Sequence, residues 1–292
     1  MKPAPFDYAR PETLDEALDL LAEYGDDAAP LAGGLSLGPM LNLRLARPTV
    51  VVDLHRLGLT AITEGANSID NSIDTGALVR QAYLKQRLAD DLSVPLVAEA
   101  LDHVGHYQTR ARGTVGGSVA HADPSAELPL CLATLDGSLT LRSRGGERQV
   151  SANDFFDDAL MTARRSDELL TSVHWPESST RTGCAFDEFA LRHGDFAIVA
   201  AAAVVSLDSN GCLMRCRIGF GGVEGRPHVV EFDQFAGERL TAEIVTGIVE
   251  HAVAALDPME DHVADAAYRR ALARTLAHRV VSRAVVRVAP AP

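Results

Sequence analysis

Two short stretches of the sequence combine adjacent glycines with a serine, and this combination favours contact between the backbone and an anion. The first is "AGGLS", residues 32–36, and the second is "TVGGS", residues 114–118. Glycine has no Cβ, so backbone N–H groups in such stretches can approach an anionic oxygen closely. Neither stretch contains a lysine. A site that binds an anion through backbone amides and has no lysine favours the diphosphate of a bound cofactor over a phosphoryl group that is transferred.

Two common nucleotide-binding patterns are missing from the chain. Neither stretch matches G-x-x-x-x-G-K-[ST], which excludes a P-loop, and no G-x-G-x-x-G links a strand to a helix. The second absence disfavours NAD bound in a doubly wound domain. For either stretch alone a plain tight turn is the better interpretation. The occurrence of both together favours an anion site.

An acidic segment, "HADPSAE", follows the second stretch directly. Asp123 and Glu127 could accept hydrogen bonds from sugar or ribityl hydroxyls. The alternative is an Asp-Pro turn followed by the N-terminus of a helix, and both can hold at once. Ser118, His121 and Asp123 lie too close in sequence to be arranged independently as a hydrolytic triad, and no nucleophile-elbow pattern is present. Hydrolysis is therefore disfavoured.

The elements around the first glycine stretch predict a compact α/β unit. A T-x-x-E capping box opens an amphipathic helix over residues 13–25, and the valine run at 50–52 predicts a buried strand. Alternation over residues 62–77 predicts short strands, and residues 81–90 and 95–104 predict helices. The second glycine stretch follows these helices.

The rest of the chain predicts further strands and a separate domain. Residues 138–151 form a hairpin signal with Gly145-Gly146 at its turn, and residues 168–176 read as a strand. The polar, turn-rich residues 176–182 indicate a domain boundary. Two apolar runs about Asn210-Gly211 then predict an antiparallel hairpin.

The end of the chain predicts a small sheet with helices on one face. Helical segments are expected at 241–256 and 264–286, and a loose tail at 288–292. The polar "RHGD", residues 192–195, precedes the first apolar run of the hairpin, where a loop meets a rigid edge.

The bulk composition excludes several classes of protein. The formal net charge is −13 and no lysine- and arginine-rich run occurs, which disfavours a nucleic-acid partner. No segment carries an uninterrupted apolar run long enough for a membrane span, and the N-terminus has no apolar core of signal-peptide length, so a cytoplasmic protein is expected. The 4 cysteines show neither a zinc nor a ferredoxin spacing, so no metal site is expected in this chain.

Four segments in order resemble the flavoprotein, or medium, subunit of the molybdenum hydroxylases, the group of carbon monoxide dehydrogenase and xanthine dehydrogenase. The resemblance covers nearly the whole chain. The segments that carry it are "PFDYARPETLDEALDLLAEYG", "LAGGLSLGPMLNLRLARPTVVVDL", "RGTVGGSVAHADPSAELP" and "RHGDFAIVA".

The resemblance implies an α+β fold: a two-lobed FAD-binding domain of the vanillyl-alcohol-oxidase (PCMH) type, then a small α+β C-terminal domain of the CO dehydrogenase flavoprotein type. The lobes would span residues 1–57 and 58–178, and the C-terminal domain residues 179–292. FAD would bind non-covalently between the lobes.

The resemblance also assigns residues to the flavin. Around the diphosphate it places Ala32, Gly33, Gly34, Leu35 and Ser36. Along the second wall it places Thr114, Gly116, Gly117, Ser118, His121, Asp123 and Glu127. Near the isoalloxazine it places Leu170, Asp195 and Phe196. No catalytic residue and no metal ligand is assigned to this chain.

The implied function is electron transfer within a complex. Partners would be a small subunit with two [2Fe–2S] clusters and a large molybdopterin subunit that hydroxylates the substrate, as a dimer of heterotrimers. Electrons would pass through FAD to NAD+, oxygen or another acceptor. Two alternatives stay open: a free-standing flavin oxidase of the same fold, and a flavin-free binding or assembly protein. The sequence does not reveal the substrate.

Overall fold

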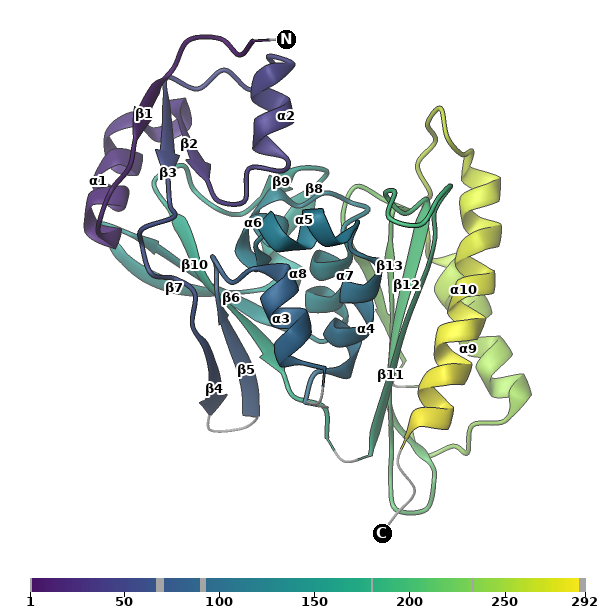
Figure 1. Cartoon of the computed structure of the whole chain (residues 1–292). Coiled ribbons are helices and arrows are strands. Elements are labelled where there is room, and N and C mark those ends of the chain that lie inside the picture. The colour runs from purple at the N-terminus through teal and green to yellow at the C-terminus, as the bar shows by residue number, and fades with distance from the viewer. Residues whose placement is uncertain (1, 67–70, 90–92, 180, 233, 289–292) are drawn as a thin grey trace.

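The computed structural model describes residues 2–66, 71–89, 93–179, 181–232 and 234–288. Most of the expected tail, and the middle of the alternating segment 62–77, lie outside these residues. Among the described residues, three larger sheets follow one another along the chain, besides a two-stranded one, and helices fill the space between the second and the third (Figure 1).

The first sheet is parallel, in the order β1-β3-β2, and carries the first glycine stretch at one end. Its strands and helices are β1 (Asp7–Ala9), α1 (Leu14–Tyr24), η1 (Gly25–Asp27), β2 (Ala28–Leu31), α2 (Leu37–Asn42) and β3 (Val50–Asp53). The expected capping box of α1 is confirmed, since the Glu16 N–H donates to Thr13 Oγ1 at 3.2 Å. Helix α1 buries Ala17, Leu18 and Leu21.

The second sheet is antiparallel, in the order β4-β5-β10-β6-β7. Its strands are β4 (Ile62–Ala66), β5 (Asn71–Gly76), β6 (Ser138–Ser143), β7 (Gly146–Ser151) and β10 (Leu169–Pro176). The segments between them are α3 (Gln81–Arg87), α4 (Pro95–His103), α5 (Tyr107–Arg112), α6 (Val115–His121), α7 (Glu127–Thr134), α8 (Ala152–Phe155), β8 (Phe156–Asp158) and β9 (Met161–Thr162). The hairpin expected over 138–151 is confirmed, with Ser143 paired to Gly146.

The third sheet is also antiparallel and belongs to the C-terminal domain. Its strands run in chain order, β11 (Thr182–Phe189), β12 (Val199–Leu207), β13 (Leu213–Gly221) and β14 (His228–Glu231). The two expected helices are present as α9 (Ala242–Ala254) and α10 (Ala266–Arg287), and Figure 1 shows both on one face of the sheet. The expected hairpin about Asn210-Gly211 is confirmed as β12 and β13.

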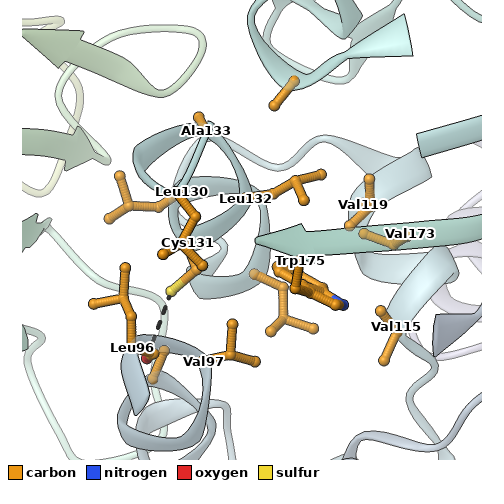
Figure 2. Packing of buried hydrophobic residues seen from close by; sticks show 14 of the residues in the cluster. Leu96, Val97, Val115, Val119, Leu130, Cys131, Leu132, Ala133, Val173 and Trp175 are labelled. Carbon is orange, nitrogen blue, oxygen red and sulfur yellow. Dashed lines mark hydrogen bonds between the residues drawn. The ribbon is translucent and has the colours of Figure 1, made fainter. Parts of the chain in front are cut away.

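Helix α7 is buried along almost its whole length, because it lies between the second and third sheets. Every residue from Leu128 to Thr134 is buried, as expected for a helix that is apolar all round. It packs against α4, where the Cys131 thiol lies 3.9 Å from the Leu96 carbonyl oxygen (Figure 2). The same cluster contains Trp175 of β10, with Nε1 donating to Thr75 Oγ1 at 3.0 Å. This core holds the second glycine stretch in place.

Among the described helices, none combines the length and the apolar character that crossing a membrane requires.

Candidate functional site

The first glycine stretch forms the connection between β2 and α2. Gly34 has a φ of +74°, a conformation that favours glycine. Within the described part of the chain, the N–H groups of Gly33, Gly34 and Leu35 donate no hydrogen bond. Amides without a protein partner need an acceptor, which water or a ligand can supply. This loop can therefore supply several amides to one anion.

The second glycine stretch uses its amides differently, because it is the first turn of α6. Thr114 is the N-cap, and its Oγ1 accepts from the Gly117 N–H at 3.0 Å. The Gly116 N–H donates to the Ala77 carbonyl at 2.9 Å, and the Ser118 N–H donates to the Thr114 carbonyl at 3.1 Å. The sequence pattern alone predicted free amides in both stretches. In the second, protein acceptors already satisfy them.

The two stretches nevertheless lie directly against each other. A Cβ added to Gly33 would come 2.6 Å from the Arg112 carbonyl oxygen and 3.1 Å from the Gly113 Cα. A Cβ added to Gly117 would lie 3.6 Å from the Ala32 Cβ. The open amides of one lobe thus face the first turn of α6 in the other. The Thr114 hydroxyl is buried there, whereas Ser118 is half-buried.

Helix α5 connects this contact to the loop between β11 and β12, which contains the RHGD segment. A Cβ added to Gly194 would lie 2.6 Å from the His106 ring, and His106 is the N-cap residue of α5. The other end of α5 is Arg112, against which Gly33 packs. Six residues at 1.5 Å each place these contacts about 9 Å apart. The glycine stretches and the RHGD loop therefore lie at opposite ends of the same short helix.

The two side chains expected at the isoalloxazine differ in exposure. Leu170 lies in β10, paired with Leu141, and is 4% exposed. Phe196 is 74% exposed and Asp195 is also exposed, in the loop that contacts His106. Phe196 therefore presents a large aromatic side chain on the surface, in the loop that contacts the His106 end of α5.

The acidic segment adopts the turn that the sequence suggested. Asp123 Oδ1 accepts from the Ser125 N–H at 2.9 Å, and Glu127 is the first residue of α7. His121 is the last residue of α6. The segment also contacts the C-terminal domain, since the Gly222 N–H donates to the Pro124 carbonyl at 2.7 Å.

Burial changes what Glu127 can do. Desolvation, reinforced by the neighbouring carboxylates of Glu188 and Asp123, raises the pKa of Glu127 to about 8. Its carboxyl is therefore protonated at neutral pH and can donate a hydrogen bond as well as accept one. From the sequence we expected this side chain only to accept hydrogen bonds.

Two residues whose charges act on Glu127, His103 and Glu188, were not predicted from the sequence. His103 at the end of α4 lies 3.5 Å from Glu188 Oε1, measured from Nδ1. Hydrogen bonding to Glu188, and the charges of Glu188, Asp187 and Glu127, raise the pKa of His103 against the effect of its own desolvation. The other oxygen of Glu188 is buried without a partner among the described residues. No short sequence pattern joins these residues, because only the packing of α4 on β11 brings them together.

Comparisons with known proteins place the chain in a family. Residues 4–178 match the FAD binding domain in molybdopterin dehydrogenase, and residues 184–284 match the CO dehydrogenase flavoprotein C-terminal domain. The chain is 38% identical to subunit alpha of the 6-hydroxypseudooxynicotine dehydrogenase complex of Paenarthrobacter nicotinovorans, over 99% of this chain and 98% of that protein. It is 33% identical to the carbon monoxide dehydrogenase medium chain of Afipia carboxidovorans, over 98% and 99%.

Solved structures agree with the sequence matches. The fold superposes on carbon monoxide dehydrogenase from Hydrogenophaga pseudoflava with a TM-score of 0.92, at 31% identity, covering 99% of this chain and 100% of that one. Quinoline 2-oxidoreductase from Pseudomonas putida 86 gives a TM-score of 0.90 at 35% identity, covering 98% and 99%. The resemblance seen in the sequence and the expected fold are thereby confirmed. The chain belongs to the FAD-binding medium subunits of the molybdenum hydroxylases, which are subunits of oxidoreductases.

Proposed function

We propose that this chain carries electrons from [2Fe–2S] clusters of a small partner subunit, through non-covalently bound FAD, to an external acceptor. A large molybdopterin subunit would hydroxylate the substrate. The observation that carries the proposal is the open set of amides at Gly33, Gly34 and Leu35, facing the capped first turn of α6. A diphosphate is the anion that such a lysine-free site suits.

The residues present fit FAD. The glycine loop offers N–H donors, and the contact of Gly33 with the Arg112 carbonyl leaves no room for a side chain between the lobes. We propose that the half-buried Ser118, His121 and Asp123 side chains bind the ribityl and ribose hydroxyls. Glu127, protonated at neutral pH, would donate to a flavin oxygen or hydroxyl.

FAD, when bound, supplies the chemistry that joins a one-electron donor to a two-electron acceptor. The chain itself would orient the cofactor and exclude water from it. We propose that Phe196 covers one part of the isoalloxazine ring and that the buried Leu170 stabilises strand β10 near that ring. The proposed units are the lobes 1–57 and 58–178 and the domain 179–292, in a dimer of heterotrimers.

The site is tested with two glycine variants. Gly33→Ala places a methyl group 2.6 Å from a backbone oxygen, so the lobes must separate and the affinity for FAD should fall at least tenfold. Gly38→Ala in α2 meets nothing within 4 Å and should bind FAD like the parent chain. Titration of flavin fluorescence on the flavin-free proteins gives both affinities. A parent chain that takes up no FAD would leave the flavin-free alternative, and equal affinities would refute the assigned contact.

The exposed phenylalanine is tested by kinetics. Phe196→Ala should change the rate of flavin reduction or reoxidation and the flavin absorption spectrum, because an aromatic neighbour of the ring is lost. Tyr107→Ala removes an equally exposed aromatic ring from α5 and serves as the control. If both variants keep parent rates and spectra, Phe196 does not face the flavin.

Co-purification of two further chains separates the proposed complex from a free-standing oxidase.

A further inference from the structure

The hairpin of β8 and β9 presents two adjacent apolar side chains on the surface. Its strands pair Asp158 with Met161, so that Ala159 and Leu160 form a two-residue turn. We call residues 159–161 the hairpin tip. Leu160 is 51% exposed and Met161 is 59% exposed. Water solvates such side chains poorly, and an apolar surface bound against them would be stabilising.

The backbone of the hairpin tip is unusual for the residue that it carries. Leu160 has a φ of +58°, a left-handed conformation that favours glycine or asparagine in a two-residue turn. About half of the leucine side chain is exposed, so packing inside the chain does not account for a leucine here. A costly backbone conformation at an exposed position points to a function at the surface.

The protein holds the hairpin tip from two sides. The Leu160 N–H donates to the carbonyl of Ala122, the C-cap of α6, at 3.0 Å, and Figure 1 shows the hairpin beside that helix. On the C-terminal domain, a Cβ added to Gly225 would clash with the Asp158 carboxylate and lie 3.1 Å from the Ala159 nitrogen. The glycine therefore permits a close approach of the two chains. The position of the tip is fixed between α6 and the C-terminal domain.

Helix α6 relates the hairpin tip to the proposed flavin site. Its N-cap, Thr114, lies at the two glycine stretches, and its C-cap, Ala122, lies about 12 Å along the helix axis. In FAD the ribityl chain separates the diphosphate from the isoalloxazine ring. A diphosphate at the first turn of α6 therefore allows the ring to lie towards the other end, where the Ala122 carbonyl holds the tip.

The loop that contains Phe196 reaches the same end of α6. Pro124, just beyond the helix, accepts from the Gly222 N–H at 2.7 Å. A Cβ added to Gly222 would lie 3.1 Å from the carbonyl oxygen of Ala197, the residue after Phe196. Exposed apolar side chains from two separate segments therefore adjoin the segment that follows α6.

We propose that the hairpin tip is a further wall of the flavin site, in which Leu160 and Met161 contact the isoalloxazine ring. The inference rests on the proposed function, because it requires FAD bound along α6. This contact covers both apolar side chains and excludes water from the ring. The hairpin then contributes to the affinity for FAD and shields the flavin from solutes in water.

Met161→Ala in the full chain tests the contact. The affinity for FAD should fall about fivefold, as when roughly half of a large apolar side chain loses its cover. Iodide should also quench the fluorescence of the bound flavin more strongly, because the ring becomes more accessible. Met214→Ala is the matched control: Met214 is 63% exposed and lies near the start of β13, about 23 Å along the strand from Gly221. It should change neither quantity.

Leu160→Gly separates contact with the flavin from a structural role. Glycine adopts the left-handed backbone without cost, so the flavin-free variant should be at least as stable as the parent. Its affinity for FAD should nevertheless fall about fivefold, and quenching by iodide should rise. Thermal unfolding of the flavin-free proteins measures the stability.

The possible failures are distinguishable. A parent chain that takes up no FAD would refute the proposed function and with it this inference. If the parent binds FAD while Met161→Ala and Leu160→Gly keep its affinity and its quenching by iodide, the proposed function stands and the contact is refuted. An equal loss of affinity in Met214→Ala, or a destabilised Leu160→Gly, would show an effect on the fold and would likewise overturn the contact.

Discussion

The two Gly-Gly-Ser stretches share a sequence pattern, but their backbone amides have different partners. In the first stretch, Gly33 and Gly34 lie in a loop whose N–H groups find no acceptor in the described protein. In the second, Gly116 and Gly117 lie in the first turn of α6, and protein oxygens accept from both. The amides of the first stretch are open to water or a ligand, whereas the second stretch is closely packed.

The neighbours of each glycine explain the difference. Gly116 lies against Ala77, where an added Cβ would meet the Ala77 Cβ at 2.5 Å. Gly33 lies against the chain that enters α6, so its small size closes the gap between the lobes. The same residue type therefore serves the core in one place and the interface between lobes in the other. Variants at the two positions should separate stability from ligand affinity.

The largest expected effect is on stability, in Gly116→Ala. The added methyl group would clash with the backbone of Ala77, and the free energy of unfolding should fall by about 3 kcal/mol. Chemical denaturation of the flavin-free chain measures this, with Gly38→Ala as the control. An unchanged unfolding midpoint would show that α6 can shift away from Ala77 without cost, and the contrast with Gly33 would disappear.

The second prediction concerns the pH dependence of the free energy of unfolding. It tests the charge state of a side chain rather than its packing. The pKa of Glu127 is raised to about 8 from its usual 4.5, so the folded chain holds a proton that the unfolded chain releases in this interval. The folded state therefore loses stability as pH rises through that window. His103, whose pKa is also raised, contributes in the same direction.

Glu127→Gln removes this loss, because the amide stays neutral. At pH 8.5 the variant should be more stable than the parent, and near pH 4.5 the two should be nearly equal. Glu23→Gln on the exposed face of α1 is the control and should show no such trend. Parallel curves of unfolding free energy against pH for Glu127→Gln and the parent would mean that the carboxyl is ionised when folded.

Local patterns in the sequence predicted local structure well. The capping box at Thr13 and the hairpins over residues 138–151 and about Asn210-Gly211 all depend on residues within a few positions of one another. All three are confirmed, although the turn of the first hairpin is at Arg144-Gly145 rather than Gly145-Gly146. The short helices α2 and α6 were missed, although Thr114 is an N-cap residue type. Glycines in the first turn obscured the helical pattern of α6, since they disfavour a helix intrinsically.

Contacts that depend on the fold were beyond the sequence pattern. His103 and Glu188 meet only because α4 packs on β11, and Gly33 meets Arg112 only because the first lobe rests on α5. Burial likewise decides that Glu127 is protonated at neutral pH, and the letters of the sequence do not show burial. The family resemblance supplied what the pattern could not, which is the identity of the ligand.

The smallest effect isolates the hydrogen bond that distinguishes the second stretch from the first. Thr114→Val keeps the shape of the side chain but removes the oxygen that accepts from the Gly117 N–H at 3.0 Å. The free energy of unfolding should fall by about 1 kcal/mol, as for other N-cap replacements. Thr114→Ser keeps the acceptor and should recover most of that loss. If serine and valine destabilise the chain equally, the contribution of Thr114 is its packing against buried neighbours, and the amides of the second stretch do not depend on this cap.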